Sequence, residues 1–159
     1  MKTLLLALGC TLAFSAVTPA FAQDKPAAAQ LTSAELLARI QSDKKGIVAK
    51  SMNLTPEEAK KFWPLYETFQ RELEVPQRAS TRAQLDYIAA DHSLTDANAK
   101  RIAEQVLAAS LEEARLQQKH FKQLLKVLPA TKAARYMQIE NKIQAVVRFE
   151  SAKAIPLVN

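Results

Sequence analysis

Residues 52–69, MNLTPEEAKKFWPLYETF, carry the strongest structural signals in this chain. Thr55 can accept a hydrogen bond from the backbone N–H of Glu58, and the Glu58 side chain can reach back to the Thr55 N–H, which makes a capping box. Pro56 suits the first helical position, where its missing N–H costs nothing. Apolar side chains then recur at helical spacing at Ala59, Phe62, Tyr66, Phe69 and Leu73. The stretch predicts the start of an amphipathic helix.

The same cap resembles the LTxxQ motif of the Spy/CpxP family of periplasmic chaperones and stress-response proteins. The motif here consists of Leu54, Thr55, Pro56, Glu57 and Glu58, with Glu58 at the glutamine position. A degenerate second copy begins 74 residues later at Leu128, with Pro129 at the threonine position and Lys132 at the glutamine position. The shift aligns Ala59 with Ala133, Lys61 with Arg135, Phe62 with Tyr136, Trp63 with Met137 and Leu65 with Ile139.

The resemblance covers roughly residues 35–155 and implies a fold and a function. In that family, long bent helices dimerise into a shallow cradle, whose basic and apolar concave face holds unfolded clients without ATP. The resemblance therefore implies a homodimeric periplasmic holdase. The candidate client-binding residues are Phe62, Trp63, Tyr66, Phe69, Arg135, Tyr136, Lys142 and Arg148. For Trp63, which precedes Pro64, burial in the core is favoured over partial exposure, and both hypotheses stay open.

The first 22 residues have the pattern of a cleaved secretory signal. Lys2 precedes an apolar run from Leu4 to Val17, and Ala20-Phe21-Ala22 offers a cleavage site. The run is too short to span a membrane, and no later stretch is long enough. A lipoprotein site at Cys10 is a weaker alternative, because Ala7 and Leu8 make a poor lipobox. We expect a periplasmic mature protein without cysteine, and thus without a disulfide.

The charge balance is mildly basic, with 22 Lys and Arg against 16 Asp and Glu, a formal net charge of +6. A weak positive field favours encounter with acidic chains or surfaces. No Lys/Arg cluster interleaved with aromatic residues occurs, so nucleic acid is not an expected partner.

Helix signals and breakers predict an all-α fold of about four helices arranged as a long bent hairpin. After a disordered segment (23–31), a single helical domain spans 32–156, and its first helix starts at Thr32 or Ser33 and breaks near Asp43 to Gly46. The second helix runs from the capping box to about Ala90 and bends at two internal prolines, although two helices split at Pro76 are an alternative.

The third and fourth helices are separated by a proline. Thr95 caps the third, which runs to Leu128, and Pro129 forms the joint. The fourth ends at Ile155-Pro156. No period-two run of useful length occurs, so no strands are expected.

A catalytic or metal-binding role finds little support in the sequence. The chain has no glycine-rich phosphate loop, no Gly-x-Ser-x-Gly elbow and no His-Glu-x-x-His pair. His92 and His120 are expected to be surface residues, and the Glu57/Glu58, Glu72/Glu74 and Glu112/Glu113 pairs to be helix-start or exposed charges. The sequence predicts no enzyme, no cofactor and no metal site.

Binding to proteins remains as the functional hypothesis. Long helices with few aromatic residues leave some apolar stripes without a core to cover them. The leading hypothesis is an exported holdase that binds unfolded or partly folded proteins. The alternative is a periplasmic regulatory subunit that docks on a membrane sensor protein, with or without a metal.

Overall fold

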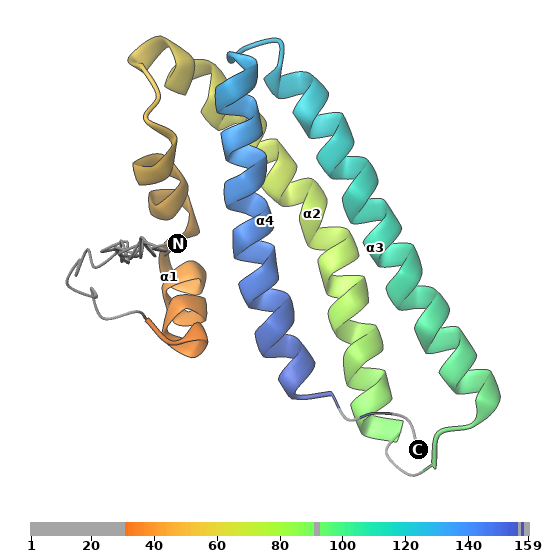
Figure 1. Ribbon diagram of the computed structural model, residues 1–159. Helices are drawn as coiled ribbons and strands as arrows, with labels where there is room; N and C mark the ends of the chain where they lie inside the picture. Colours follow the sequence, from red (N-terminus) through yellow and green to blue (C-terminus); the bar gives the residue numbers. More distant parts are fainter. Residues whose placement is uncertain (1–30, 91–92, 156, 158–159) are drawn as a thin grey trace, which may run out of the picture. The chain divides into compact units, whose positions relative to one another are not determined.

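Four α-helices and no strand occur in the residues that the structure describes, 31–90, 93–155 and 157 of a computed structural model. The helices are α1 (Ser33–Met52), α2 (Pro56–Ala90), α3 (Asp96–Leu124) and α4 (Ala130–Lys153), as Figure 1 shows. The predicted all-α fold is confirmed for these residues. The predicted signal peptide (1–22), nearly all of the predicted disordered segment (23–31) and His92 lie outside the described residues.

Local caps start three of the helices. The Glu58 N–H donates to Thr55 Oγ1 over 3.3 Å and the Thr55 N–H donates to Glu58 Oε2 over 2.8 Å, so the capping box expected before Pro56 is present. Thr32 and Thr95 accept hydrogen bonds in the same way at the starts of α1 and α3. Each cap satisfies backbone N–H groups that the first helical turn leaves without a partner.

The break expected near Asp43 to Gly46 is confirmed. Asp43 has φ −150° and ψ 57°, which lies outside helical geometry. Its Oδ1 accepts a hydrogen bond of 2.8 Å from the Gly46 N–H, so Asp43 caps the second part of α1. The two parts of α1 can therefore point in different directions, as an internal cap allows.

α2 is one helix of 35 residues that contains both Pro64 and Pro76. The alternative of two helices split at Pro76 is wrong. Pro76 is buried, and the helix continues past it although its ring removes one backbone hydrogen bond. The N-terminal part of α2 turns away from the rest of the helix (Figure 1), and a proline within a helix is a common cause of such a bend.

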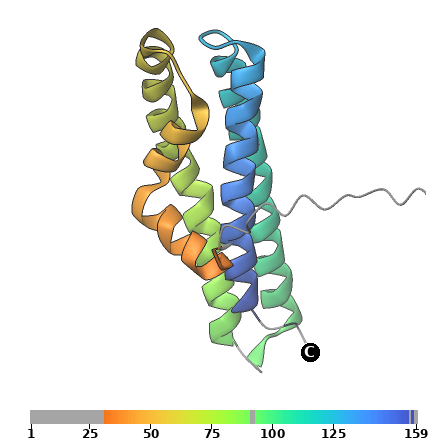
Figure 2. The ribbon, with the colours of Figure 1, turned by 60° about the vertical axis from the view of Figure 1, so that its left-hand side comes forward.

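Two helix pairs make most of the backbone contacts in the unit Leu31–Asn159. α2 packs along α3, and α1 packs along α4, while α3 and α4 meet over a smaller area (Figure 2). The core lies in the half of the bundle that holds the α1–α2 and α3–α4 connections. Its buried residues are Ile40, Val48, Met52, Phe62, Tyr66, Phe69, Leu73, Leu124, Leu128, Ala133, Tyr136 and Ile143.

The other half of the α2–α3 hairpin has a thin core. Several large apolar side chains there remain exposed to solvent, namely Val75, Leu85, Ile88, Leu107 and Leu111. Their exposure agrees with the shortage of core that the composition of the helices indicates. In the described residues, no helix is both long and apolar enough to cross a membrane.

Candidate functional site around the aromatic core

The predicted aromatic residues cluster inside the bundle. Phe62 packs edge to face on Tyr136, with ring centroids 5.2 Å apart, and Tyr66 contacts both rings. Phe62, Tyr66, Phe69 and Tyr136 are at most 5% exposed. Four of the predicted client-binding residues are therefore core residues, and in this structure they offer no surface to a client.

Trp63 lies at the edge of this cluster. Its ring is half-buried and packs edge to face on Phe62 and Tyr66, at centroid distances of 5.0 and 5.3 Å. The Lys45 Nζ lies 5.1 Å from the ring centroid, within cation–π range. Trp63 thus joins the core on one side and is covered by a charged side chain on another.

A buried carboxylate, Glu140, adjoins the cluster. Its Oε1 accepts hydrogen bonds from Tyr136 Oη (3.0 Å) and Gln70 Nε2 (2.8 Å), and Lys44 Nζ lies 2.8 Å from its Oε2. Lys44 also donates to Gln70 Oε1 over 2.7 Å. The network provides charge compensation for a carboxylate that is 1% exposed, which would otherwise be very costly.

Burial and the Glu140 charge change the acidity of both tyrosines. They raise the pKa of Tyr66 to about 12 and the pKa of Tyr136 well above its usual value. Both hydroxyl groups therefore stay protonated, and Tyr136 acts as a hydrogen-bond donor to Glu140. The sequence alone did not indicate this network, although Glu140 stands at helical spacing between Tyr136 and Ile143 on the apolar face of α4.

His120 is buried in the core, so its predicted surface position is wrong. Its ring stacks on Phe69 at 4.1 Å with an interplanar angle of 4°, and it meets the edge of Tyr136 at 5.4 Å. Neither ring nitrogen has a partner with hydrogen-bond geometry among the described residues. Burial lowers its pKa to about 4, against the opposing effects of Glu72 and Gln123. The imidazole is therefore neutral at pH 7.

Glu113 is also buried, in contrast to the exposed charge that the sequence predicts. It is 7% exposed, and its Oε2 accepts a hydrogen bond of 2.6 Å from Arg148 Nη2. The pair joins α3 to α4. Arg148, a predicted client-binding residue, thus has a carboxylate partner within the bundle.

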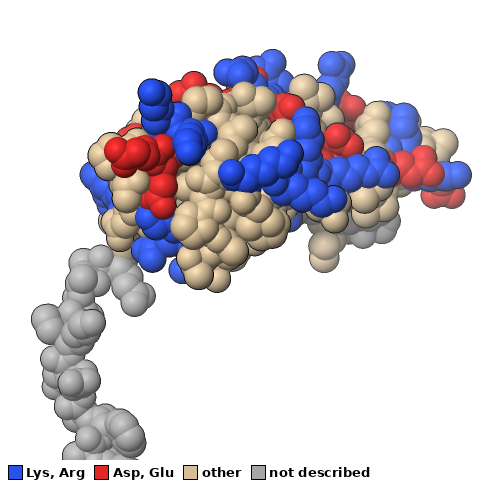
Figure 3. Space-filling view, turned by 90° about the horizontal axis from the view of Figure 1, so that it is seen from above, with Lys and Arg blue, Asp and Glu red and all other residues tan. Residues whose placement is uncertain are grey.

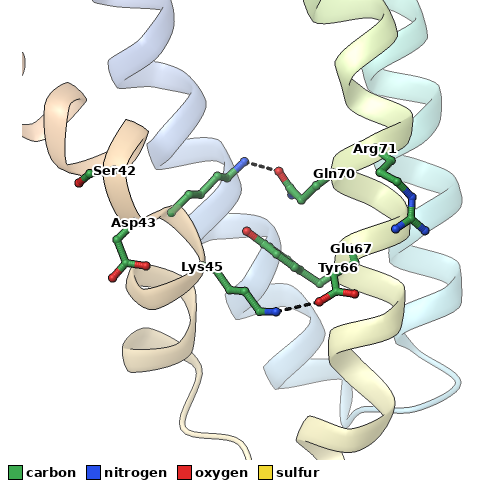
Figure 4. Close-up of a pocket in the computed structure, with 8 residues that line it drawn as sticks. Ser42, Asp43, Lys45, Tyr66, Glu67, Gln70 and Arg71 are labelled. Carbon is green, nitrogen blue, oxygen red and sulfur yellow. Dashed lines mark hydrogen bonds and ion pairs between the residues drawn. The ribbon is translucent and has the colours of Figure 1, made fainter.

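A cavity of about 460 Å³ lies between α1 and α2 at the break in α1. Figure 4 shows Tyr66 pointing from α2 toward α1, and Lys45 reaching Glu67. The Lys45 Nζ to Glu67 Oε1 distance is 2.7 Å, and this ion pair lowers the pKa of Glu67. The two helices are thus joined here by one ion pair and by the hydrogen bond from Lys44 to Gln70.

A shallow groove of about 710 Å³ runs between α1 and α4, and we call it the α1–α4 groove. Its apolar walls include the half-buried side chains of Leu36, Ile47, Ile139 and Val146. Arg135 and Lys142, two of the predicted client-binding residues, also line it.

The cations of this groove differ in their contacts. Arg135 Nε donates to the Ser51 carbonyl oxygen over 2.6 Å, which fixes one end of its side chain, and Lys142 is exposed. From the end of the bundle shown in Figure 3, basic side chains lie beside uncharged surface.

The two motif copies meet at the connections. Lys132 of the second copy forms an ion pair with Glu58 of the first, which lowers the pKa of Glu58, and it also donates to the Asn53 carbonyl oxygen. Leu54 is half-buried against the core. The residues at the glutamine positions of the two copies therefore contact each other directly.

Among the described residues, no three His, Cys, Asp or Glu side chains lie close enough together to hold a metal ion. No protein-family model, no curated protein and no solved structure matches this chain. The resemblance to the Spy/CpxP family rests on the motif residues.

Proposed function

We propose that the protein is an exported, ATP-independent chaperone that holds unfolded or partly folded proteins in the α1–α4 groove. The observation that carries the proposal is the composition of this groove, where apolar side chains from two helices lie beside Arg135 and Lys142. An unfolded chain presents apolar side chains and carboxylates together, and both find complementary groups here.

The shallow shape of the groove suits a holdase. Apolar contact over a limited area gives weak binding, so many sequences can be held and released without ATP. Lys142 is exposed, and charge attraction at such a position speeds encounter more than it strengthens the complex. A homodimer would double the binding surface, and the thin, apolar half of the α2–α3 hairpin is available for association.

An aggregation assay tests the proposal. The purified protein should suppress light scattering from two unrelated denatured clients at a near-stoichiometric ratio. Failure with both clients would reject the chaperone hypothesis and favour a dedicated partner, such as a membrane sensor protein.

A matched pair of variants locates the site. Lys142→Glu changes the charge in the α1–α4 groove, and Lys126→Glu makes the same change at an exposed position in the α3–α4 connection. We expect Lys142→Glu to reduce suppression several-fold, most strongly for acidic clients and at low salt. Equal activity of both variants would place client binding elsewhere.

A further inference from the structure

A second groove, of about 530 Å³, is lined mainly by α2 and α4, with residues of α1 and α3 also contributing, and we call it the α2–α4 groove. Its lining differs from that of the α1–α4 groove because uncharged polar side chains make up half of the lining residues, beside apolar residues such as Ile143 and Val147. Four hydroxyl residues and five glutamines line it, the glutamines being Gln41, Gln70, Gln77, Gln84 and Gln144.

Three of the glutamines recur at a regular interval on α2. Gln70, Gln77 and Gln84 stand seven residues apart, which is two helical turns or about 10.5 Å along the axis. Seven residues return close to the same face of the helix, so the three amide side chains lie in a row along α2. The amide of Gln70 is already bonded to Lys44 and Glu140, while Gln77, Gln84 and, from α4, Gln144 also line the groove.

The charged residues that line the groove already have partners. Lys44 pairs with Glu140 (2.8 Å), Glu113 with Arg148 (2.6 Å) and Glu74 with Arg78 (2.8 Å). A charged ligand would have to compete with these pairs. The lining therefore favours a ligand that is polar and uncharged.

A side-chain amide offers two N–H donors and a carbonyl acceptor, the same groups that a peptide bond presents. We propose that the α2–α4 groove binds the main chain of an extended, uncharged polypeptide segment. Recognition of the main chain does not depend on sequence. A neutral sugar is the rival ligand, but sugar rings commonly pack on aromatic faces, and the described lining contains no aromatic residue.

The inference extends the proposed chaperone function, because a client could be held by its main chain here and by its side chains in the α1–α4 groove. The two sites should differ in how their binding depends on salt. Binding in the α2–α4 groove should be insensitive to salt, whereas binding near Lys142 should weaken as salt screens the charge.

The test uses a ten-residue peptide of Ser, Thr, Asn and Gly with blocked ends, and calorimetric titration of the purified protein. We expect saturable binding that low and high salt leave unchanged, and no binding of the same peptide with N-methylated amides. Gln77→Leu together with Gln144→Leu should weaken binding at least tenfold. Gln118→Leu, on the exposed surface of α3, should leave it unchanged.

Several results would overturn the inference: no binding of the peptide to the wild-type protein, equal binding of the N-methylated peptide, or binding of a neutral oligosaccharide instead. The N-methylated peptide keeps the test decisive even if the double variant does not fold. Peptide binding without suppression of aggregation would reject the chaperone function and keep this site. Suppression of aggregation without peptide binding would reject this site and keep the chaperone function.

Discussion

Phe62 and Tyr136, which occupy equivalent positions in the two motif copies 74 residues apart, pack edge to face with their ring centroids 5.2 Å apart. One turn earlier, the equivalent residues Glu58 and Lys132 form an ion pair. The starts of α2 and α4 therefore lie side by side. The internal similarity found in the sequence corresponds to a direct contact between the two copies.

The cap at Thr55 should contribute measurably to stability. Thr55→Ala removes the acceptor for the Glu58 N–H, and loss of such a cap lowers the free energy of unfolding by about 1 kcal/mol. Urea denaturation followed by circular dichroism measures the change. Thr131→Ala is the control, because Thr131 lies after the capping position of α4 and should have little effect. Equal stability of both variants would contradict the role of Thr55.

Lys44 should stabilise the fold mainly because its positive charge compensates the negative charge of the buried Glu140 carboxylate. Lys44→Met leaves a buried carboxylate without its cation, which should lower the free energy of unfolding by about 3 kcal/mol. Glu140→Gln added to Lys44→Met should recover part of the loss, since no buried charge then remains. A double-mutant cycle measured by denaturation gives the coupling, and additive effects would argue against the ion pair.

Gly46 should behave unlike an ordinary glycine in a helix. Alanine at this position would gain about 1 kcal/mol in helix propensity, but its Cβ would collide with the Asp43 carboxylate that caps Gly46. We therefore expect Gly46→Ala to give no increase in melting temperature. In an Asp43→Ala background the collision is gone, and Gly46→Ala should then stabilise the protein. Stabilisation in both backgrounds would show that the carboxylate moves aside freely.

His120 should make stability fall in mild acid. Its folded-state pKa of about 4 lies below the ordinary value of 6.5, so the folded state disfavours the proton that the unfolded state binds. Above about pH 6.5 the histidine is neutral in both states and does not lower stability. As the pH falls from there toward 4, it lowers the free energy of unfolding by up to about 1.4 kcal/mol per pH unit.

Two ionisable groups near His120 bear on whether its ring is protonated. Glu72 on α2 favours protonation but pairs with Lys119, and Tyr136 on α4 stays neutral. The difference in stability between wild type and His120→Phe, measured from pH 7 to pH 4, should isolate the histidine, because other titrating groups are common to both. A difference that does not change with pH would contradict a buried neutral imidazole.

The sequence predicted features that depend on neighbouring residues. Thr55 and Glu58 act over three positions, so their capping box is visible in the chain itself. The break near Asp43 to Gly46 was predicted from the low helix propensity of Gly46, but the cap that Asp43 supplies was not. The partners of Glu140 could not be predicted, because Lys44 and Gln70 come from α1 and α2 and meet it only when the helices pack. The burial of His120 has the same cause, since its place beside Phe69 depends on how α3 lies on α2.

α1 is expected to be the last helix to dock during folding. Its contacts with α4 join distant positions, as between Arg135 and Ser51, which are 84 residues apart, whereas α2 and α3 are neighbours in the chain. Closing so long a loop is slow, and the break at Asp43 leaves two helical parts too short to persist alone. Lys44 and Lys45 can reach α2 as soon as that helix forms, but the contacts of α1 with α4 must await the final helix, so a nascent chain lacks them until α4 is made.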